Sequence, residues 1–341
     1  MPIKPVKTCW EEGLKLERVL YARRHVLHVD FARCYGCDLC VLACPKEALK
    51  QVPPQVEEGR LVRRGRVDID SDKCSLCGAC VLMCPFGAFK LEVDGEPAIP
   101  VLRSGSYPEL VKKVEVDGAL CDPSCTLCQD VCPLEAIKVV GTRKRLKVDV
   151  ERCNGCRSCV ELCSALSMDE GRVRVDEDSC DGCGACLNVC EVGALSLEEI
   201  VEVKVDLAKC PGCGLCAVIC PSQAVRVEKP IKGYLELDPS KCPEGCRCCL
   251  DACPVLAIYE EDGSLSVDPS LCVYCKACVY ACPVEGALKV VRTELLHTDV
   301  KSGAWNRALA KLVSPAYVSG ELRARAMGKV AQVLTETYGP T

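Results

Sequence analysis

Thirty-two of the 34 cysteines in this chain of 341 residues fall into eight groups of four. Six quartets have the spacing Cys-x-x-Cys-x-x-Cys-x-x-x-Cys, and the third and seventh have one more residue in the first gap. In chain order the quartets are Cys34, Cys37, Cys40 and Cys44; Cys74, Cys77, Cys80 and Cys84; Cys121, Cys125, Cys128 and Cys132; Cys153, Cys156, Cys159 and Cys163; Cys180, Cys183, Cys186 and Cys190; Cys210, Cys213, Cys216 and Cys220; Cys242, Cys246, Cys249 and Cys253; and Cys272, Cys275, Cys278 and Cys282. Because thiolates bind soft metals, each quartet is a candidate metal site.

Zinc and iron–sulfur clusters are the two candidates for such a site. Structural zinc favours two Cys pairs separated by a longer finger, whereas here three Cys share one short loop and the fourth follows at helical distance. That is the bacterial-type run in which three Cys hold one [4Fe–4S] cluster and the fourth ligates the neighbouring cluster. The pattern predicts eight [4Fe–4S] clusters. Pro follows the fourth Cys in six quartets, at Pro45, Pro85, Pro133, Pro221, Pro254 and Pro283.

Several positions depart from the repeat. Ser164 and Glu191 stand where Pro is expected, either as neutral changes or as a restored N–H and a nearby charge that shift cluster potentials. Cys249 is assigned as a ligand because it preserves the quartet spacing, with Cys248 as the alternative register. Cys9 is expected to be a buried or free thiol.

The segments around the quartets predict the elements that position them. Apolar and polar residues alternate over 66–70, 172–176 and 264–268, and again after quartets over 136–140 and 287–291, as in half-buried strands. The stretch between the third and fourth Cys has helical spacing. Glycine precedes the second Cys in five quartets, where a tight turn and close approach to cluster sulfur both favour it, at Gly36, Gly155, Gly182, Gly212 and Gly245. The repeated unit is therefore strand, Cys loop, short helix, strand.

These units predict an α+β fold of four tandem, or one nested, ferredoxin-like two-[4Fe–4S] domains with helical N- and C-terminal arms. Pairing neighbouring quartets gives domains at 26–95, 112–171, 172–228 and 229–293, with a linker at 96–111 and arms at 1–25 and 294–341. The N-terminal arm is expected to hold a helix over 10–21, and the C-terminal arm helices over 304–313 and 320–337. The short hairpin-like segment 166–179 supports the alternative, in which quartets four and five form a domain inserted between quartets three and six.

Composition excludes several classes of protein. A net charge of −5 argues against nucleic acid as the main partner. No apolar stretch is long enough to span a bilayer, and the first 25 residues lack a signal-peptide pattern, so a cytoplasmic protein is expected. Aromatic residues make up only 4% of the chain, which predicts that clusters replace much of the missing core.

With these motifs the chain resembles polyferredoxins, over about residues 26–293. It is most similar to the polyferredoxin subunit of archaeal tungsten or molybdenum formylmethanofuran dehydrogenase, in the segment MCPFGAF (83–89) and in the insertion VDGEPAIP (93–100) that continues to SYPEL (106–110). The resemblance implies an anaerobic electron-transfer subunit that exchanges low-potential electrons with a catalytic W/Mo subunit during CO2 reduction in methanogenesis. It also implies links to heterodisulfide reductase, hydrogenase or ferredoxin, and self-association of the chain is a further possibility.

Other functions find little support. No phosphate loop or dinucleotide fingerprint is present, and His25, His28 and His297 have no matched nucleophile or acid, so no catalytic residues are predicted. An iron–sulfur store or scaffold is the remote alternative. The basic segments 60–66 and 143–147 are expected to be solvated turns or internal charge compensation, with a docking patch for an acidic partner as the alternative.

Overall fold

The Cys loops and the short helices after them are the repeated element of the fold. The computed structural model describes residues 5–20 and 23–313. Between the third and fourth Cys of the fifth quartet lies the 3-10 helix η2 (Ala185–Val189). The other seven quartets have α-helices there, which confirms the predicted helices: α1 (Leu39–Ala43), α2 (Ala79–Met83), α4 (Leu127–Asp130), α5 (Ser158–Leu162), α6 (Leu215–Ile219), α7 (Cys248–Ala252) and α8 (Ala277–Ala281).

The N-terminal arm is a sheet, and the helix predicted over 10–21 is wrong. A five-stranded sheet has the order β1-β2-β3-β8-β9. Its strands are β1 (Val6–Trp10), β2 (Gly13–Leu20), β3 (Arg23–Asp30), β8 (Phe89–Val93) and β9 (Glu96–Pro97). In β2, Leu14 and Leu16 are fully buried, whereas Lys15 and Glu17, which alternate with them, are half-buried. This period of two residues, and the pairing of β2 with β1 on one side and β3 on the other, make this segment a strand.

Four further antiparallel strand pairs lie around the first two and the last two quartets. Between the first and second quartets, β4 (Leu49–Val52) pairs with β7 (Arg66–Ile69), and β5 (Gln55–Glu57) pairs with β6 (Arg60–Arg63). Around the seventh and eighth quartets, β16 (Ile231–Leu237) pairs with β19 (Leu288–Leu295), and β17 (Ile258–Glu261) pairs with β18 (Ser264–Val267). The 3-10 helix η3 (Pro239–Lys241) precedes the seventh quartet, with Asp238 accepting at its N-cap. The strands predicted over 66–70, 264–268 and 287–291 are confirmed.

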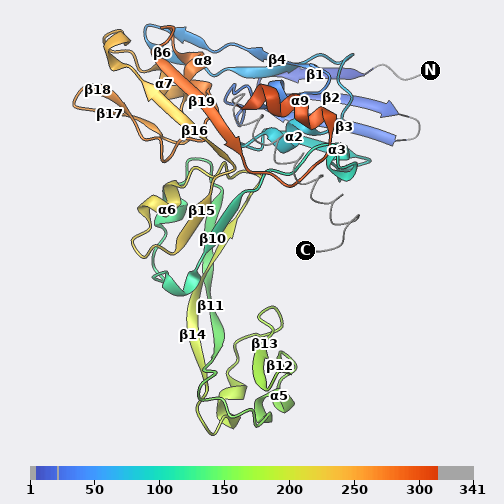
Figure 1. Cartoon of the computed structure of the whole chain (residues 1–341), viewed down its shortest axis with the longest axis vertical. Helices are drawn as coiled ribbons and strands as arrows, with labels where there is room; N and C mark the ends of the chain where they lie inside the picture. Colours follow the sequence, from blue (N-terminus) through green and yellow to red (C-terminus); the bar gives the residue numbers. More distant parts are fainter. Residues whose placement is uncertain (1–4, 21–22, 314–341) are drawn as a thin grey trace, which may run out of the picture. The chain divides into compact units, whose positions relative to one another are not determined.

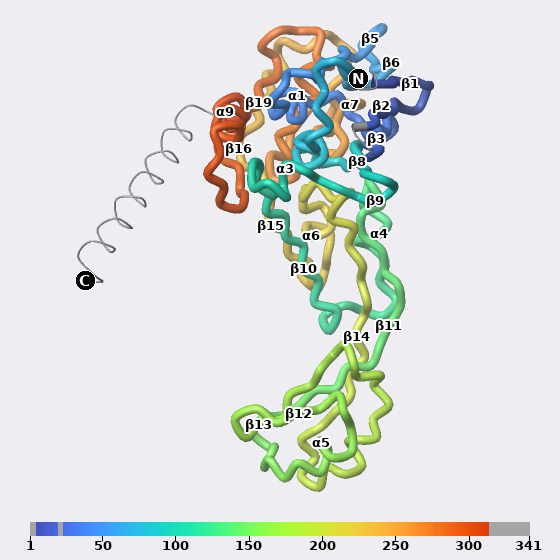
Figure 2. The backbone as a smooth tube through the Cα atoms, turned by 90° about the vertical axis from the view of Figure 1, so that its right-hand side faces the viewer, coloured from blue at the N-terminus to red at the C-terminus, as the bar shows by residue number. Residues whose placement is uncertain are grey.

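The middle of the chain is folded as an insertion. Strand β11 (Ile137–Val148) pairs with β14 (Leu195–Val205), and β12 (Leu166–Asp169) pairs with β13 (Arg172–Val175). Figures 1 and 2 show the β11–β14 ribbon with α5, β12 and β13 gathered at one end of it. Outside this ribbon, β10 (Lys113–Val116) pairs with β15 (Val225–Glu228), and the 3-10 helix η1 (Gly118–Leu120) precedes the third quartet. Quartets four and five are therefore enclosed between two paired strands.

The chain divides into two compact units. The larger contains the described residues of Met1–Lys113, Leu207–Gly214 and Val227–Thr341, and the smaller is Val114–Asp206 with Leu215–Arg226. The contiguous domains expected at 112–171 and 172–228 differ from this strand pairing, because β11 of the first range pairs with β14 of the second. The physical reason is the antiparallel β11–β14 ribbon, which brings the two ends of the inserted segment together.

The main aromatic packing of the larger unit lies under α9 (Gly303–Leu312), which confirms the helix predicted over 304–313; the helix predicted over 320–337 lies outside the described residues. Trp305 of α9 is fully buried, with its ring centre 5.7 Å from that of Tyr107 and 5.0 Å from that of His297. The insertion that contains α3 (Pro100–Arg103) supplies Tyr107, whose hydroxyl donates to the carbonyl oxygen of Ala43 at 2.7 Å. This insertion therefore ties α9 to α1.

Replacing Trp305 with Ala should lower the free energy of unfolding of the larger unit by about 3–5 kcal/mol, because the cavity left under α9 cannot close. Anaerobic urea denaturation followed by circular dichroism measures this. Trp10, which is 47% exposed on β1, provides the control. The Trp10→Ala variant should have a free energy of unfolding close to that of the parent chain. Equal losses in the two variants would contradict the assigned packing.

Candidate iron–sulfur centres

Seven of the eight Cys loops have a left-handed residue just before the second Cys. That residue has φ between 51° and 76° in seven quartets, at Gly36, Leu76, Gly155, Gly182, Gly212, Gly245 and Tyr274. At Gly36 the loop also packs tightly, because an added Cβ would lie 2.5 Å from the carbonyl carbon of Gly65. The left-handed turn bends the chain so that the three loop thiols converge. The predicted glycine turns are confirmed, and Leu76 and Tyr274 adopt the same conformation without glycine.

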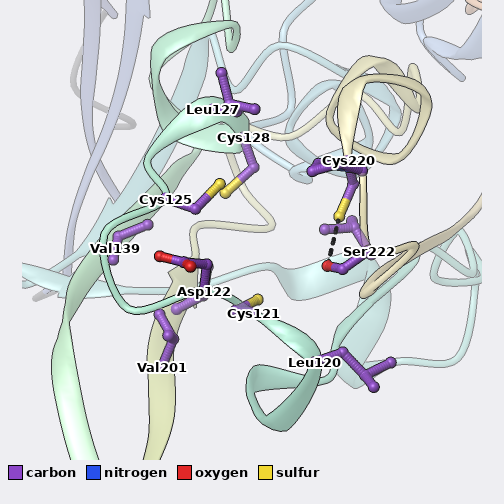
Figure 3. A pocket seen from close by; sticks show the side chains of 13 residues that line it. Leu120, Cys121, Asp122, Cys125, Leu127, Cys128, Val139, Val201, Cys220 and Ser222 are labelled. Carbon is purple, nitrogen blue, oxygen red and sulfur yellow. Dashed lines mark hydrogen bonds between the residues drawn. The ribbon is translucent and has the colours of Figure 1, made fainter.

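Several of the Cys loops receive a fourth thiol from another quartet. Cys121, Cys125 and Cys128 of the third quartet and Cys220 of the sixth line one cavity of about 130 Å³. Figure 3 shows their sulfur atoms around its centre, with Cys220 opposite the loop. The Cys220 pKa is lowered although burial opposes this, because Ser222 Oγ, 3.6 Å from the sulfur, and nearby backbone N–H groups stabilise the thiolate. This set comes from quartets that lie about 90 residues apart in the sequence.

The same arrangement recurs in the larger unit. Cys44 of the first quartet lines a cavity with Cys74, Cys77 and Cys80 of the second. Likewise Cys282 of the eighth quartet lines a cavity with the loop thiols of the seventh, Cys242, Cys246 and Cys249. In both cases three Cys of one quartet meet the last Cys of its neighbour.

Electrostatics identify the reciprocal sets. Burial raises the pKa of Cys34 to about 11, and the Cys84 thiol acts in the same direction. Burial also raises the pKa of Cys272 to about 11, and there the Cys253 thiol acts in the same direction. The first quartet therefore pairs with the second, and the seventh with the eighth, through exchanged fourth Cys.

The fourth and fifth quartets pair with each other. Burial raises the pKa of Cys186, and the thiol of Cys163 contributes in the same direction. Six Cys of these two quartets share one apolar cluster with Leu146, Leu166, Val173 and Leu195: Cys153, Cys159, Cys163, Cys180, Cys186 and Cys190. Cys163 thus lies with the fifth quartet and not with Cys121, whose thiol neighbours are Cys220, Cys128 and Cys125.

This arrangement agrees with the nested alternative. We name the first module (quartets one and two), the middle module (three and six), the inserted module (four and five) and the last module (seven and eight). One set stays a prediction, that of Cys132 with the sixth-quartet loop, because Cys210 and Cys213 belong to the larger unit and Cys216 to the smaller.

The donor sets fit iron–sulfur clusters. Among residues 5–20 and 23–313, no three His, Cys, Asp or Glu side chains are arranged to hold a single metal ion. The thiols instead surround cavities whose other lining groups are mainly apolar, as at Leu120, Val139 and Val201. Four thiolates around a space larger than one ion are the ligand set of a [4Fe–4S] cluster.

Comparisons with known proteins agree with this geometry. A family model described as a 4Fe-4S dicluster domain matches residues 7–88 and 209–257, and models of 4Fe-4S binding domains match 150–166, 172–195 and 265–286. A ferredoxin 7Fe from Hydrogenibacillus schlegelii is 30% identical over 63 residues, which are 18% of this chain and 70% of that protein. A ferredoxin from Alicyclobacillus acidocaldarius is 47% identical over 53 residues, 16% of this chain and 64% of the relative. Two other bacterial relatives are matched over only 38% and 37% of their length.

The chain belongs to the ferredoxin family. It is a polyferredoxin, because it repeats the [4Fe–4S] ferredoxin motif along one chain. It resembles a chain of the formate dehydrogenase–heterodisulfide reductase–formylmethanofuran dehydrogenase complex from Methanospirillum hungatei, with 27% identity and a TM-score of 0.66. That match covers 91% of this chain and 92% of the other, whereas the two ferredoxins described above match 16% and 18% of this chain.

Backbone N–H groups of the polyferredoxin point at the fourth thiol of several quartets. The N–H of an alanine four residues later lies 3.2–3.3 Å from the sulfur of Cys44, Cys84, Cys132, Cys190 and Cys253. The donors are Ala48, Ala88, Ala136, Ala194 and Ala257, each at the start of the next strand. Such donors stabilise negative charge on sulfur and on a bound cluster. In the sequence, the recurring alanine four residues after the last Cys is the only signal of these N–H donors.

The two quartets without Pro depart from the repeat in different ways. In the fifth, Glu191 replaces Pro but the turn is kept, with the Ala194 N–H 3.2 Å from Cys190 Sγ. In the fourth, the buried Ala165 follows Cys163 by two residues instead of four, so the turn itself is shortened. Hydrogen bonds from Ser158 lower the pKa of the Cys156 thiol, and the Glu191 carboxylate opposes this shift. The hypothesis that the charge of Glu191 shifts a cluster potential stays a prediction.

The two cysteines outside the quartets occupy different environments. Cys248 is fully buried, with its sulfur 3.7 Å from that of Cys246, and it lines the same cavity as Cys249. Burial raises the pKa of Cys249 to about 12, with Cys282, Cys242 and Cys246 acting in the same direction. Those neighbours are the remaining members of its set, so Cys249 is the better ligand. Cys9 is exposed on β1.

The basic segments are paired within the chain. Arg60 Nε lies 2.8 Å from Asp251 Oδ2, and Arg143 Nε lies 3.2 Å from Glu202 Oε1. Arg64 stacks over the Tyr35 ring at 4.5 Å. These contacts favour internal charge compensation over a docking patch.

The nested pairing predicts which cysteine variants lose the same cluster. Cys121→Ala with Cys220→Ala should lose about four iron atoms, because both thiols belong to one set. Cys121→Ala with Cys163→Ala should lose about eight, because two sets are broken. Metal analysis of anaerobically prepared chains measures both. Sequential pairing requires the opposite result, so the two variants control each other.

Glu191→Gln should raise the reduction potential of one cluster, because it removes a negative charge beside the Cys156 thiol. An EPR-monitored redox titration measures the shift. Glu170, which is exposed in the turn between β12 and β13, provides the matched control Glu170→Gln. An unchanged titration, or the same shift in both variants, would show that the departure at Glu191 is electrostatically neutral.

Proposed function

We propose that this polyferredoxin holds eight [4Fe–4S] clusters and relays low-potential electrons to or from the catalytic subunit of a formylmethanofuran dehydrogenase-type complex. The 32 quartet Cys are the proposed ligands, in four modules of two clusters each. The proposed boundaries follow the nested pairing, with the inserted module between the two halves of the middle module. The polyferredoxin itself is proposed to have no catalytic site.

The observation that carries this proposal is the likeness over nearly the whole of both chains to one chain of the Methanospirillum hungatei complex. An isolated two-cluster ferredoxin is too short to contain a counterpart to four modules, so a match over nearly the whole of both chains favours a polyferredoxin subunit. That complex also contains formate dehydrogenase and heterodisulfide reductase, so heterodisulfide reductase is the second proposed partner. Electron exchange with a hydrogenase or a free ferredoxin, and pairing of two polyferredoxin copies, remain alternative proposals.

The chain's residues are suited to electron transfer. Bound clusters would supply reversible one-electron storage at potentials set by hydrogen bonds, charge and exposure. Alanine N–H donors and left-handed loop residues hold the thiols in fixed geometry, which reduces the rearrangement that accompanies a change of charge. His297 packs against Trp305, in the packing role expected for it.

A cytoplasmic location is part of the proposal. Among the helices of residues 5–20 and 23–313, none has the length and apolar character needed to cross a membrane.

Anaerobic native purification with metal analysis tests the function. We expect about 32 iron atoms per chain, reversible low-potential reduction, and co-eluting tungsten or molybdenum. The Cys121→Ala/Cys220→Ala chain serves as the calibrated control, with about four fewer iron atoms. An iron-free but folded chain would overturn the proposal, and clusters that resist reversible reduction yet pass to an acceptor apoprotein would support storage instead.

A further inference from the structure

A buried ion pair joins the first and last modules of the larger unit. Asp38, next to Cys37 at the start of α1, pairs with Arg292 of β19, and both side chains are almost completely buried. Tyr280 of α8 donates its hydroxyl to Asp38 Oδ2 at 2.9 Å. Lys276 Nζ lies 3.7 Å from the same oxygen. The two partners of the ion pair are 254 residues apart in the chain.

Arg292 also holds the eighth-quartet Cys loop. Its Nε donates to the Tyr274 carbonyl oxygen at 2.8 Å and its Nη2 to that of Cys275 at 3.3 Å. The loops on the two sides are close, because Arg292 contacts both the Cys275 carbonyl oxygen and Asp38, which directly follows Cys37. The ion pair therefore lies where two thiol sets of different modules meet.

Lys229 makes a second bridge to the same loop. It follows β15 of the middle module, and its Nζ donates to the carbonyl oxygens of Ser270 and, at 3.2 Å, Cys272. Burial lowers the Lys229 pKa, while the thiols of Cys213 and Cys272 act in the opposite direction. Lys229 thus lies between thiols of the sixth and eighth quartets.

Lys112 makes a third bridge. Its Nζ donates to the carbonyl oxygen of Leu207 at 2.5 Å and to that of Cys210 at 3.3 Å. Burial raises the pKa of Cys84, and backbone N–H groups together with the Lys112 cation oppose the rise. The chain packs closely here, because a Cβ on Gly87 would lie 2.5 Å from the Ala208 carbonyl oxygen.

The three cations share one geometry. Each contacts a backbone carbonyl in or beside a Cys loop and also acts on a thiol or carboxylate of another module, so together they join the first, middle and last modules pairwise. The Cys272 thiol is acted on by two of them: burial raises its pKa to about 11, and Lys229 and Arg292 oppose the rise. All of the residues involved belong to the larger unit.

We propose that Arg292, Lys229 and Lys112 form a three-way junction at which the electron paths of the first, middle and last modules meet. They are positioning residues that hold the Cys loops together and offset the negative charge gathered between them. The inference rests on the proposed function, since it requires loaded modules. Each transfer moves one electron from one module to the next, and no bond is made or broken.

Charge at this junction has a defined sign of effect. An oxidised cluster with four thiolates carries a net charge of about −2, and reduction adds another negative charge. Nearby cations therefore favour reduction, and a nearby carboxylate opposes it. Removing Arg292 or Lys229 should lower the potential of the last-module cluster beside Cys272, whereas removing the charge of Asp38 should raise it.

EPR-monitored redox titration of the full chain tests the junction, with iron content measured on the same samples. The variants are Arg292→Gln, Arg292→Lys, Lys229→Gln, Lys112→Gln and Asp38→Asn. Lys289→Gln is the control. Lys289 lies on the same strand as Arg292, but its side chain is exposed, forms an ion pair with Glu236 and packs over the Tyr234 ring. The titration component that is missing from a Cys278→Ala chain identifies the last-module cluster.

Arg292→Gln and Lys229→Gln should lower the potential of that same component, each by at least a tenfold change in its reduction equilibrium, about 59 mV for one electron. Asp38→Asn should raise it, Arg292→Lys should restore most of the parental value, and Lys112→Gln should move a different component. Opposite signs for Arg292→Gln and Asp38→Asn cannot arise from simple loss of structure.

The junction is wrong if these variants keep parental potentials, shift no more than Lys289→Gln, or if Asp38→Asn shifts in the same direction as Arg292→Gln. Should Arg292→Gln lose iron, the signs in Lys229→Gln and Asp38→Asn decide the question. Parental potentials with full iron would refute the junction and leave the proposed function standing. An iron-free parent chain would refute the function itself.

Discussion

The convergence of thiols from two separate quartets is the constraint on which the rest of this polyferredoxin depends. Three Cys of one loop and the last Cys of a second loop line each of three cavities. A cluster bound in this way cross-links stretches of chain that lie far apart in sequence, as structural metals do in small domains. Because aromatic residues make up only 4% of the chain, such cross-links would supply stability that a larger apolar core supplies in other proteins.

Many thiolates in one chain concentrate negative charge, and groups close to the thiols compensate for it. Alanine N–H groups point at the fourth thiol of several quartets, and left-handed residues shape the loops. The surface arginines are largely paired with carboxylates, as Arg60 is with Asp251. The cations that act on thiols are instead the partly or fully buried ones, among them Lys229 and Arg292. Position, more than net charge, decides which cations can act on the sites.

Modules that are neighbours in space are not always neighbours in sequence in this molecule. The first and last modules share the larger unit and contact each other through Asp38 and Arg292. The inserted module lies between β11 and β14, and its Cys156 and Cys183 are exposed, whereas Cys37 and Cys275 are buried. Order along the chain is thus a poor guide to the order in which electrons could pass between modules.

Sequence alone predicted what depends on local spacing. The quartets, the short helices after the third Cys and strands such as β13 and β18 follow from ligand gaps of a few residues and from a period of two. The pairing of Cys121 with Cys220 could not be decided in this way, because identical quartets offer equivalent partners and only the β11–β14 ribbon selects among them. The N-terminal sheet was missed because the pairing of β2 with β1 and β3 overrides the weak local preference of these residues. Asp38 and Arg292 carried no pattern at all, since an ion pair spanning 254 residues exists only once the modules have packed.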